Sequence, residues 1–463
     1  MAIGTARLSC RPHLQYLSGM KTIDTLIHAS WVVPVEPEGL VLDDHCIAIH
    51  EGQILAILPS GEAAQHYQAE HELDRCGHVL IPGLINAHTH AAMSLMRGLA
   101  DDLPLMEWLG QHIWPAEGRW VSPEFVRDGT RLAMAEMLRS GTTCFNDMYF
   151  FPDEVARQVE HAGMRAVLGM IIIDFPTAWA QNAEEYLHKG LALHDSVRDS
   201  SLISTALAPH APYTVSDEPL QKVLMFAEEL DIPVHMHVHE TATEVSQENE
   251  QRGQRPLARL AELGLLSPRL LAVHMTQLDE AEIQAVADAN AHVVHCPESN
   301  LKLASGFCPV QKLLDAGINV ALGTDGAASN NDLDMLGEMR SAALLAKGVA
   351  GDAAALPAAR ALSMATINGA RALGLDSVCG SLTPGKAADI VAIRMDQIET
   401  QPLYQVISQL VYACGRDQVR DVWVAGRHLL KDRQLTTLDE AAILDSARQW
   451  RDKIATSDQE ASA

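Results

Sequence analysis

The chain has 463 residues, of which 34 are Lys or Arg and 60 are Asp or Glu, giving a formal net charge of −26. This excess of negative charge would repel a phosphate backbone, so it argues against polymeric nucleic acid as a partner and suits a small neutral or cationic substrate. The longest strongly apolar stretch, Ala166–Ile173, is far shorter than the roughly 18 residues that a membrane-spanning helix needs. We therefore expect neither nucleic acid nor membrane as a partner.

Residues 1–19 lack both the continuous apolar stretch and the small-residue cleavage site of a secretory signal, and Met20 is a natural start. We expect this N-terminal extension to be dispensable for folding. The eight cysteines include no C-x-x-C pair, which in a chain of this size favours reduced thiols over a disulfide framework. These features predict a cytoplasmic protein.

Two strand-like segments, Ile23–Val35 and Cys46–Leu58, come next along the chain. Proline and glycine residues interrupt them, as is typical of short strands joined by turns. Similar segments occur near the other end of the chain, at Ala388–Arg394 and Val419–Leu430. We expect both ends to pair into one small β domain.

Between these flanks, from about residue 80 to residue 346, short apolar runs alternate with longer amphipathic segments, which is the pattern of repeated β-α units. Helix signals separate the runs, such as Ser122 and Pro123 at the start of one helix and Gly141 beyond its end. Eight alternating units favour a closed barrel over an open doubly wound sheet. The candidate strands are Val79–Ile85, Thr142–Phe145, Ala166–Ile173, Ile203–Ala208, Val234–His239, Leu270–His274, His292–His295 and Asn319–Thr324.

The predicted fold is therefore α/β, a (β/α)8 TIM barrel with a small β-sandwich domain built from both chain ends. We expect the extension at residues 1–19, the first part of the sandwich at 20–78 and the barrel at 79–379. Residues 380–463 should complete the sandwich and end in a C-terminal helix. Active sites of such barrels lie at the C-terminal ends of the strands, which is where reactive side chains are sought.

His88 and His90 end the first predicted barrel strand. Alternate residues of a strand point to the same face, so both imidazoles can approach one metal ion. The alternative is that they are two solvated loop histidines, since short motifs carry a real false-positive risk.

The run from His235 to Glu240, with histidine at every second position, ends the fifth predicted strand. A coincidental cluster is the alternative here, but buried histidines without polar partners would be costly. His274 ends the sixth strand and Asp325 follows the eighth. Either residue alone would more often be a cap or a structural residue. Four strand ends that all carry imidazole or carboxylate groups predict a metal-dependent active site.

Five motifs add to this pattern: Pro82–His90, the His237-x-x-Glu240 step, Ser299–Gly306, Gly323–Asn331 and Gly380–Ile390. With them the sequence resembles the amidohydrolase superfamily and, within it, the 5′-methylthioadenosine/S-adenosylhomocysteine deaminases, over nearly the whole chain. The resemblance implies hydrolytic deamination of the adenine ring of these nucleosides or of adenosine, giving the inosine analogue and ammonia. The implied partner is a small nucleoside, and a homo-oligomer is compatible with the sequence.

Two other functions remain as alternatives. An amidohydrolase of the guanine deaminase or triazine chlorohydrolase type would use the same metal motif on another heteroaromatic ring. A non-catalytic scaffold would keep the fold without the activity, because a fold alone never proves a function.

The resemblance implies that His88, His90, His237 and Asp325 bind one divalent metal ion per chain, usually zinc, with iron or manganese as alternatives. The fourth predicted strand ends without a lysine. A carboxylated lysine that bridges two metal ions is therefore not expected.

The resemblance also implies catalytic roles for Glu240, His274 and Asp325. A bound zinc ion lowers the pKa of water, and Asp325 beside it can accept a proton as the water attacks the ring carbon that bears the amine. Protonated Glu240 can donate to the adjacent ring nitrogen, and His274 can stabilise the tetrahedral centre before ammonia departs. The H-x-E and P-C-x-x-C signature of the cytidine-deaminase fold is absent from the sequence.

For substrate binding, the resemblance implies that Trp108 and Glu117 contact the ribose hydroxyls, that His210 faces the sugar or its 5′ group, and that Glu240 contacts the adenine. The alternatives are that Trp108 packs against neighbouring leucines and that Glu117 is solvated. The family's additional arginine contact has no counterpart in residues 174–179.

Overall fold

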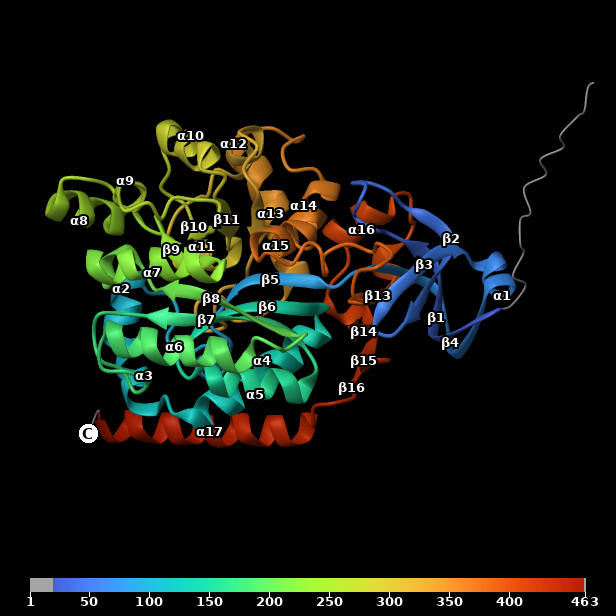
Figure 1. The fold of residues 1–463 in the computed structure, drawn as a ribbon, viewed down its shortest axis with the longest axis horizontal. Coiled ribbons are helices and arrows are strands. Elements are labelled where there is room, and N and C mark those ends of the chain that lie inside the picture. The colour runs from blue at the N-terminus through green and yellow to red at the C-terminus, as the bar shows by residue number, and fades with distance from the viewer. Residues whose placement is uncertain (1–19, 462–463) are drawn as a thin grey trace, which may run out of the picture.

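The computed structural model describes residues 20–461 and contains two eight-stranded sheets. One sheet lies at the centre of the larger body in Figure 1, and the other lies to one side, where strands from both ends of the chain meet. The extension of residues 1–19 lies outside the described residues, so its dispensability stays a prediction. No helix in the described part of the chain is long and apolar enough to cross a membrane.

The eight strands of the first sheet run parallel and follow one another in chain order. They are β5 (Leu84–Thr89), β6 (Thr142–Tyr149), β7 (Arg165–Ile172), β8 (Ile203–Pro209), β9 (Val234–Val238), β10 (Leu270–His274), β11 (His292–His295) and β12 (Val320–Leu322). The ring closes just beyond β12, where the Asp325 N–H donates to the His88 carbonyl oxygen at 3.0 Å. Thr324 N–H also donates to Asn86 Oδ1 at 2.9 Å. The predicted (β/α)8 barrel is thereby confirmed.

Helices follow the strands, and the predicted helix start at Ser122 is confirmed, because its Oγ accepts a hydrogen bond from Phe125 N–H at 3.2 Å. The longer helices are α4 (Pro123–Arg139), α5 (Pro152–Ala162), α6 (Ala183–Val197), α7 (Asp217–Leu230), α8 (Ala242–Arg252), α10 (Glu280–Asp288), α13 (Met335–Ala350) and α17 (Glu440–Ala461). The shorter ones are α1 (Ala63–His66), α2 (Leu105–Glu107), α3 (Trp114–Trp120), α9 (Pro256–Glu262), α11 (Pro297–Lys302), α12 (Val310–Asp315), α14 (Ala358–Met364), α15 (Ile367–Ala372) and α16 (Val406–Tyr412). Short 3-10 helices are η1 (Ser60–Glu62), η2 (Ala91–Met96), η4 (Pro212–Thr214), η5 (Ile398–Thr400) and η6 (Arg416–Gln418). The segment η3 (Trp108–Ile113) is a π-helix.

The second sheet is mixed and has the strand order β16-β15-β14-β13-β4-β1-β2-β3. Its strands are β1 (Lys21–Val32), β2 (Leu42–His50), β3 (Gln53–Pro59), β4 (Tyr67–Pro82), β13 (Ile390–Arg394), β14 (Val419–Val424), β15 (Arg427–Lys431) and β16 (Gln434–Leu435). The two halves join where β13 pairs antiparallel with the end of β4. One apolar cluster contains residues of both halves, including Ile27, Ile49, Leu80, Ile390 and Trp423. Both chain ends thus build one β domain, and we retain the domain boundaries at residues 79 and 379 as a proposal.

The predicted strand Val79–Ile85 is divided between the two sheets. Its first part, through Pro82, pairs with β13 in the second sheet, whereas Leu84 begins the barrel. Gly83 makes this passage possible, because a Cβ atom there would lie 1.9 Å from Thr143 Oγ1. Pro82 and Gly83 form a dipeptide that is common in turns, but the residues on both sides are apolar and buried, so the pattern does not show that they belong to two sheets.

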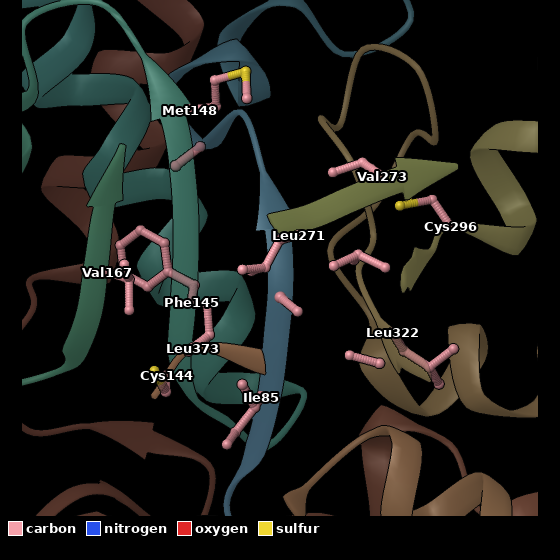
Figure 2. Packing of buried hydrophobic residues seen from close by; sticks show 14 of the residues in the cluster. Ile85, Cys144, Phe145, Met148, Val167, Leu271, Val273, Cys296, Leu322 and Leu373 are labelled. Atoms are coloured by element: carbon pink, nitrogen blue, oxygen red, sulfur yellow. The ribbon is translucent and has the colours of Figure 1, made fainter. Parts of the chain in front are cut away.

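The interior of the barrel is filled by apolar side chains from successive strands. Figure 2 shows Ile85, Phe145, Val167 and Leu271 of β5, β6, β7 and β10 close together, and all four are fully buried. Side chains in such cores pack at crystal-like density. The polar groups that follow are found at the C-terminal ends of the strands.

A buried ion pair links the barrel to the second sheet. Arg165, at the start of β7, donates from Nε to Asp389 Oδ2 at 2.9 Å and from a terminal nitrogen to Asp389 Oδ1 at 3.2 Å. Asp389 Oδ1 also accepts the Ala425 N–H at 2.7 Å. Both charged side chains are almost completely buried, so each depends on the other for compensation of its charge.

We expect Asp389→Ala to lower the free energy of unfolding by about 3–5 kcal/mol, because it leaves the buried Arg165 guanidinium without a counter-charge. Asp153→Ala is the matched control, since Asp153 pairs with Arg157 on the exposed surface of α5 and should cost less than about 1 kcal/mol. Urea-induced unfolding of both variants would measure the difference. Equal losses would show that the buried pair does not hold the two sheets together.

Candidate active site

Four side chains from three strand ends meet at one point of the barrel mouth. His88 and His90 lie at the end of β5, His237 lies on β9, and Asp325 follows β12. One ligand atom from each of them lies within 4.8 Å of the others. The tertiary structure therefore brings together the four residues that the sequence predicted as metal ligands.

Hydrogen bonds set which nitrogen of each imidazole faces this point. His90 Nδ1 lies 2.6 Å from the Met148 carbonyl oxygen, and His237 Nδ1 lies 2.8 Å from the His210 carbonyl oxygen. A carbonyl oxygen only accepts, so both Nδ1 atoms carry a hydrogen, and Nε2 is the nitrogen that each ring turns toward the cluster. Metal-ligating histidines have this arrangement, which fixes the tautomer and the ring orientation.

His88 has a different partner, because its Nδ1 lies 2.8 Å from Nε2 of His235. On its other side, His88 Nε2 lies 3.1 Å from His237 Nε2 and 3.2 Å from Asp325 Oδ1. Three imidazole nitrogens and a carboxylate oxygen in such proximity fit a four-coordinate divalent ion. His235 Nδ1 has no hydrogen-bond partner among the described residues.

Burial and neighbouring charges set the protonation of these groups. Burial lowers the pKa of His88 to about 4, so this imidazole is neutral at physiological pH, as a metal ligand must be. Burial by itself would raise the pKa of Asp325, but hydrogen bonds with His88 and His90 hold it well below its usual range. Asp325 is therefore a carboxylate in the folded protein.

The chain leaves the strands near this point in strained conformations. His274 has φ 75° and Asp325 has φ 63°, in the left-handed region that side chains other than glycine rarely adopt. Such strain costs about 1–3 kcal/mol per residue and persists only where the surroundings enforce it, which is common at active sites. For Asp325, the hydrogen bond from its N–H to the His88 carbonyl oxygen enforces this conformation.

Glu240 lies just beyond β9 and is buried beside the cluster. Its N–H donates to Glu244 Oε2 at 2.7 Å, and its Oε1 accepts the Ser305 hydroxyl at 3.4 Å. Its Oε2 lies 3.8 Å from His274 Nε2. Burial raises the pKa of Glu240 above its ordinary value, although the charge of His274 opposes the shift. The site thus holds one carboxyl group with a raised pKa beside one with a lowered pKa.

A cavity of about 280 Å³ opens above these groups. His90, His237, Glu240, His274 and Asp325 form its polar end. The rest of the lining is mainly apolar, and no lysine or arginine is found among the lining residues in the described part of the chain. The apolar lining includes Met93, Leu105, Leu109, Ile113, Val121, Phe150, Ile171, Ile173, Phe175 and Leu303.

Trp108, Glu117 and His210 all line the same cavity. The Trp108 indole N–H donates to the Ala100 carbonyl oxygen at 3.1 Å. Burial raises the pKa of Glu117 to about 7, although the Tyr149 hydroxyl opposes the shift. All nine predicted site residues therefore lie in the metal cluster or the cavity lining, and their individual roles remain predictions.

The amidohydrolase family model matches residues 79–429 of this chain, which includes the whole barrel and every residue of the site. The chain belongs to the amidohydrolase family. A 5-methylthioadenosine/S-adenosylhomocysteine deaminase of Teredinibacter turnerae is 52% identical over 438 residues, which cover 95% of this chain and 99% of the relative.

Solved structures resemble this amidohydrolase over most of its length. A crystal structure of an adenosine deaminase from Xanthomonas campestris with bound zinc has a TM-score of 0.94 and 56% identity, covering 95% of this chain and all of the other. The atrazine chlorohydrolase of Arthrobacter aurescens has a TM-score of 0.86 at 24% identity, covering 92% and 99% of the two chains, and this similarity shows the fold alone.

Several neighbours of the site are absent from the sequence prediction. Tyr149 ends β6 with its hydroxyl beside Glu117, and Glu244 reaches back from the first turn of α8 to the Glu240 N–H. His235 belongs to the predicted histidine run, yet its place behind His88 depends on the pairing of β9 with the rest of the barrel. Of these residues only His235 gave a signal in the sequence, through its place in the histidine run, because the predicted strand Thr142–Phe145 ended before Tyr149.

We expect the purified protein to hold about one divalent metal ion per chain, because four ligand atoms converge on one point. Asp325→Ala should lose this metal, whereas His210→Ala should retain it, since only the backbone carbonyl of His210 supports His237. Elemental analysis of the three proteins is the measurement. A wild-type protein with no metal, or with two tightly bound ions, would contradict the assignment.

Proposed function

We propose that this amidohydrolase is a zinc-dependent deaminase of adenine nucleosides that acts on 5′-methylthioadenosine or S-adenosylhomocysteine, giving the inosine analogue and ammonia. The similarity to the Teredinibacter deaminase over nearly the full length of both chains carries this proposal. The zinc in the Xanthomonas structure supports zinc as the metal here. His88, His90, His237 and Asp325 would hold it.

Zinc bound at these residues would lower the pKa of a water molecule and so supply the nucleophile. Asp325 is ionised, so it can accept a proton from that water during attack on the ring carbon that bears the amine. The raised pKa of Glu240 favours the protonated form, which can donate its proton to the adjacent ring nitrogen. His274, with Nε2 3.8 Å from Glu240, would stabilise the tetrahedral centre until ammonia departs.

The ribose would lie between Glu117 and Trp108. A carboxylate at Glu117 can accept hydrogen bonds from both the 2′- and the 3′-hydroxyl, and the Trp108 ring supplies an apolar surface beside it. His210 would face the sugar or its 5′ group from the end of β8. This pair favours a ribosylated substrate over the free bases of guanine deaminases and over triazines.

The apolar end of the cavity would receive the 5′ substituent. A methylthio group is apolar and suits Met93, Ile113 and Phe150, because thioether and aromatic groups pack favourably. The carboxylate of a homocysteine tail would find no lysine or arginine among the described lining residues. We therefore infer that methylthioadenosine is the better of the two substrates.

The protein would work in the cytoplasm on a small-molecule substrate. The cysteines among the described residues are all free, and free thiols are typical of a reducing compartment. A homo-oligomer is compatible with the sequence, and light scattering would measure the oligomeric state.

We expect Glu240→Gln to lower kcat by a factor on the order of 10² to 10⁴, the range for loss of a general acid, and to keep its metal. In the wild type, kcat should fall as the pH rises through the pKa of Glu240, because the proton is then lost. This fall should be absent from the residual activity of the variant. Glu248→Gln is the control, since it removes a buried carboxylate of α8 that binds Arg259 instead. Near-normal turnover by Glu240→Gln would exclude Glu240 as the donor.

Substrate choice is tested by ammonia release from methylthioadenosine, S-adenosylhomocysteine, adenosine, adenine and guanine. We expect kcat/KM to be higher for methylthioadenosine than for adenosine. The difference should correspond to about 1–3 kcal/mol of transition-state binding, the contribution of one well-buried apolar group. Adenine should be poor, because it leaves Glu117 without its hydroxyl partners at a cost of about 1–3 kcal/mol.

The variant Glu117→Ala separates the two ends of the nucleoside. It should erase the preference for nucleosides over adenine and keep the preference for the thioether, because the two contacts are distant and nearly additive. Turnover of adenine or guanine as fast as methylthioadenosine by the wild type would place the protein among the free-base deaminases.

A further inference from the structure

The strand β11 contributes no residue to the metal cluster, yet the segment that follows it contacts the reacting groups. This segment contains α11 and the motif Ser299–Gly306, to which the proposed reaction assigns no role. Ser299 and Asn300 are adjacent on α11 and both are almost completely buried. Buried polar side chains of this kind are retained only where they form hydrogen bonds.

Ser299 holds one oxygen of Asp325. Its hydroxyl donates to Asp325 Oδ2 at 2.7 Å, which turns the other oxygen, Oδ1, toward His88 and His90 at 3.2 Å from each Nε2. Gly326 N–H donates to Oδ1 at 2.8 Å. Without the Ser299 hydroxyl, the carboxylate loses the bond that holds Oδ2, and only the contacts of Oδ1 restrict its rotation about the Cβ–Cγ axis.

Asn300 holds His274. Its Oδ1 lies 2.9 Å from His274 Nδ1, and an amide oxygen only accepts, so Nδ1 carries the hydrogen. The opposite nitrogen, Nε2, then faces Glu240 and the cavity. The amide Nδ2 of Asn300 has no hydrogen-bond partner among the described residues, so the bond to His274 is the polar contact that this side chain makes there.

The backbone of α11 is itself well anchored. Asn300 N–H donates to the Cys296 carbonyl oxygen at 3.0 Å, and Leu303 N–H donates to the Ser299 carbonyl oxygen at 3.0 Å. Lys302 Nζ donates to the Ala328 carbonyl oxygen at 3.0 Å, in the loop that follows Asp325. The two side chains therefore project from a rigid element tied to the same loop as the carboxylate that one of them orients.

We propose that Ser299 and Asn300 are positioning residues, in which Ser299 fixes the metal-facing oxygen of Asp325 and Asn300 fixes the tautomer and orientation of His274. The proposal rests on the proposed function, because it assigns these residues to the groups that carry out the deamination. Neither residue touches the substrate, and each acts through its partner. One short helix thus aligns two reacting groups that come from different strands.

Asn300→Leu tests the second contact, because it keeps the branched shape and the number of heavy atoms of the side chain and deletes the acceptor. With methylthioadenosine, kcat should fall by a factor on the order of 10 to 100, the usual cost of a misplaced catalytic group, while KM and metal content stay near those of the wild type. Introduced into a His274→Ala background, Asn300→Leu should have no further effect on kcat, because its partner is absent.

The control for this variant is Asn368→Leu. Asn368 is also buried, but its side chain donates to the Val320 carbonyl oxygen at the opposite end of β12, so its loss should lower thermal stability and leave kcat unchanged. If Asn300→Leu does not fold, Asn300→Ser is the second variant. Its side chain is one bond shorter, so its oxygen lies farther from His274 Nδ1, and it adds no bulk to the core. The same loss of kcat is expected. A loss of kcat of equal size with and without His274 would overturn the proposal, as would full activity of Asn300→Leu.

Ser299→Ala tests the first contact by a readout other than activity. Zinc affinity, measured by competition with a chromophoric chelator, should weaken by a factor on the order of 10 to 100, the usual cost of losing a partner of a metal ligand. Ser140→Ala removes another fully buried hydroxyl, bonded only to backbone carbonyls, and should bind zinc as the wild type does. Unchanged zinc affinity in Ser299→Ala would overturn this half of the proposal. Failure of the wild type to release ammonia from any nucleoside would refute the proposed function instead, and the two failures are therefore distinguishable.

Discussion

Three imidazole rings at the barrel mouth must stay neutral and turn Nε2 toward one carboxylate oxygen. Each is held by a bond to Nδ1, which goes to a backbone carbonyl for His90 and His237 and to His235 for His88. Two of these three partners lie on a neighbouring strand or strand end, and the third, His235, lies on β9, which is not a neighbour of β5. The orientation of His88 therefore depends on the assembly of the barrel. The bond from Asp325 N–H to the His88 carbonyl oxygen both completes the ring and brings the fourth ligand into place.

This concentration of polar groups is unfavourable by itself, because burial penalises charge and the strand ends are strained. The surrounding structure offsets the cost and divides the carboxyl groups into two states. Hydrogen bonds with imidazoles keep the pKa of Asp325 low, whereas burial raises the pKa of Glu240. Two carboxyl groups with pKa values moved apart by their surroundings suit the proposed roles of general base and general acid at one pH.

The polar end and the apolar lining of the cavity come from different parts of the chain. Its polar end comes from strand ends of the barrel, which are rigid, and much of its apolar lining comes from the segment after β5 that contains the π-helix Trp108–Ile113. π-helical turns are rare and occur mostly at functional sites. In the proposed reaction the metal site would carry the chemistry, and this segment would set which substituent fits.

The sequence by itself determined the fold class and the eight barrel strands, because alternating apolar and amphipathic segments are local patterns. Histidines at the predicted strand ends indicated a metal site, and the resemblance to amidohydrolases indicated which residues bind the metal ion. It could not show that the run around Gly83 passes from one sheet to the other, since both parts are equally buried. The partners of the reacting groups, such as Ser299 with Asp325 and Asn300 with His274, were decided only by the tertiary structure. These pairs are 26 residues apart in the chain, and their contact depends on the register of adjacent strands, which no local pattern specifies.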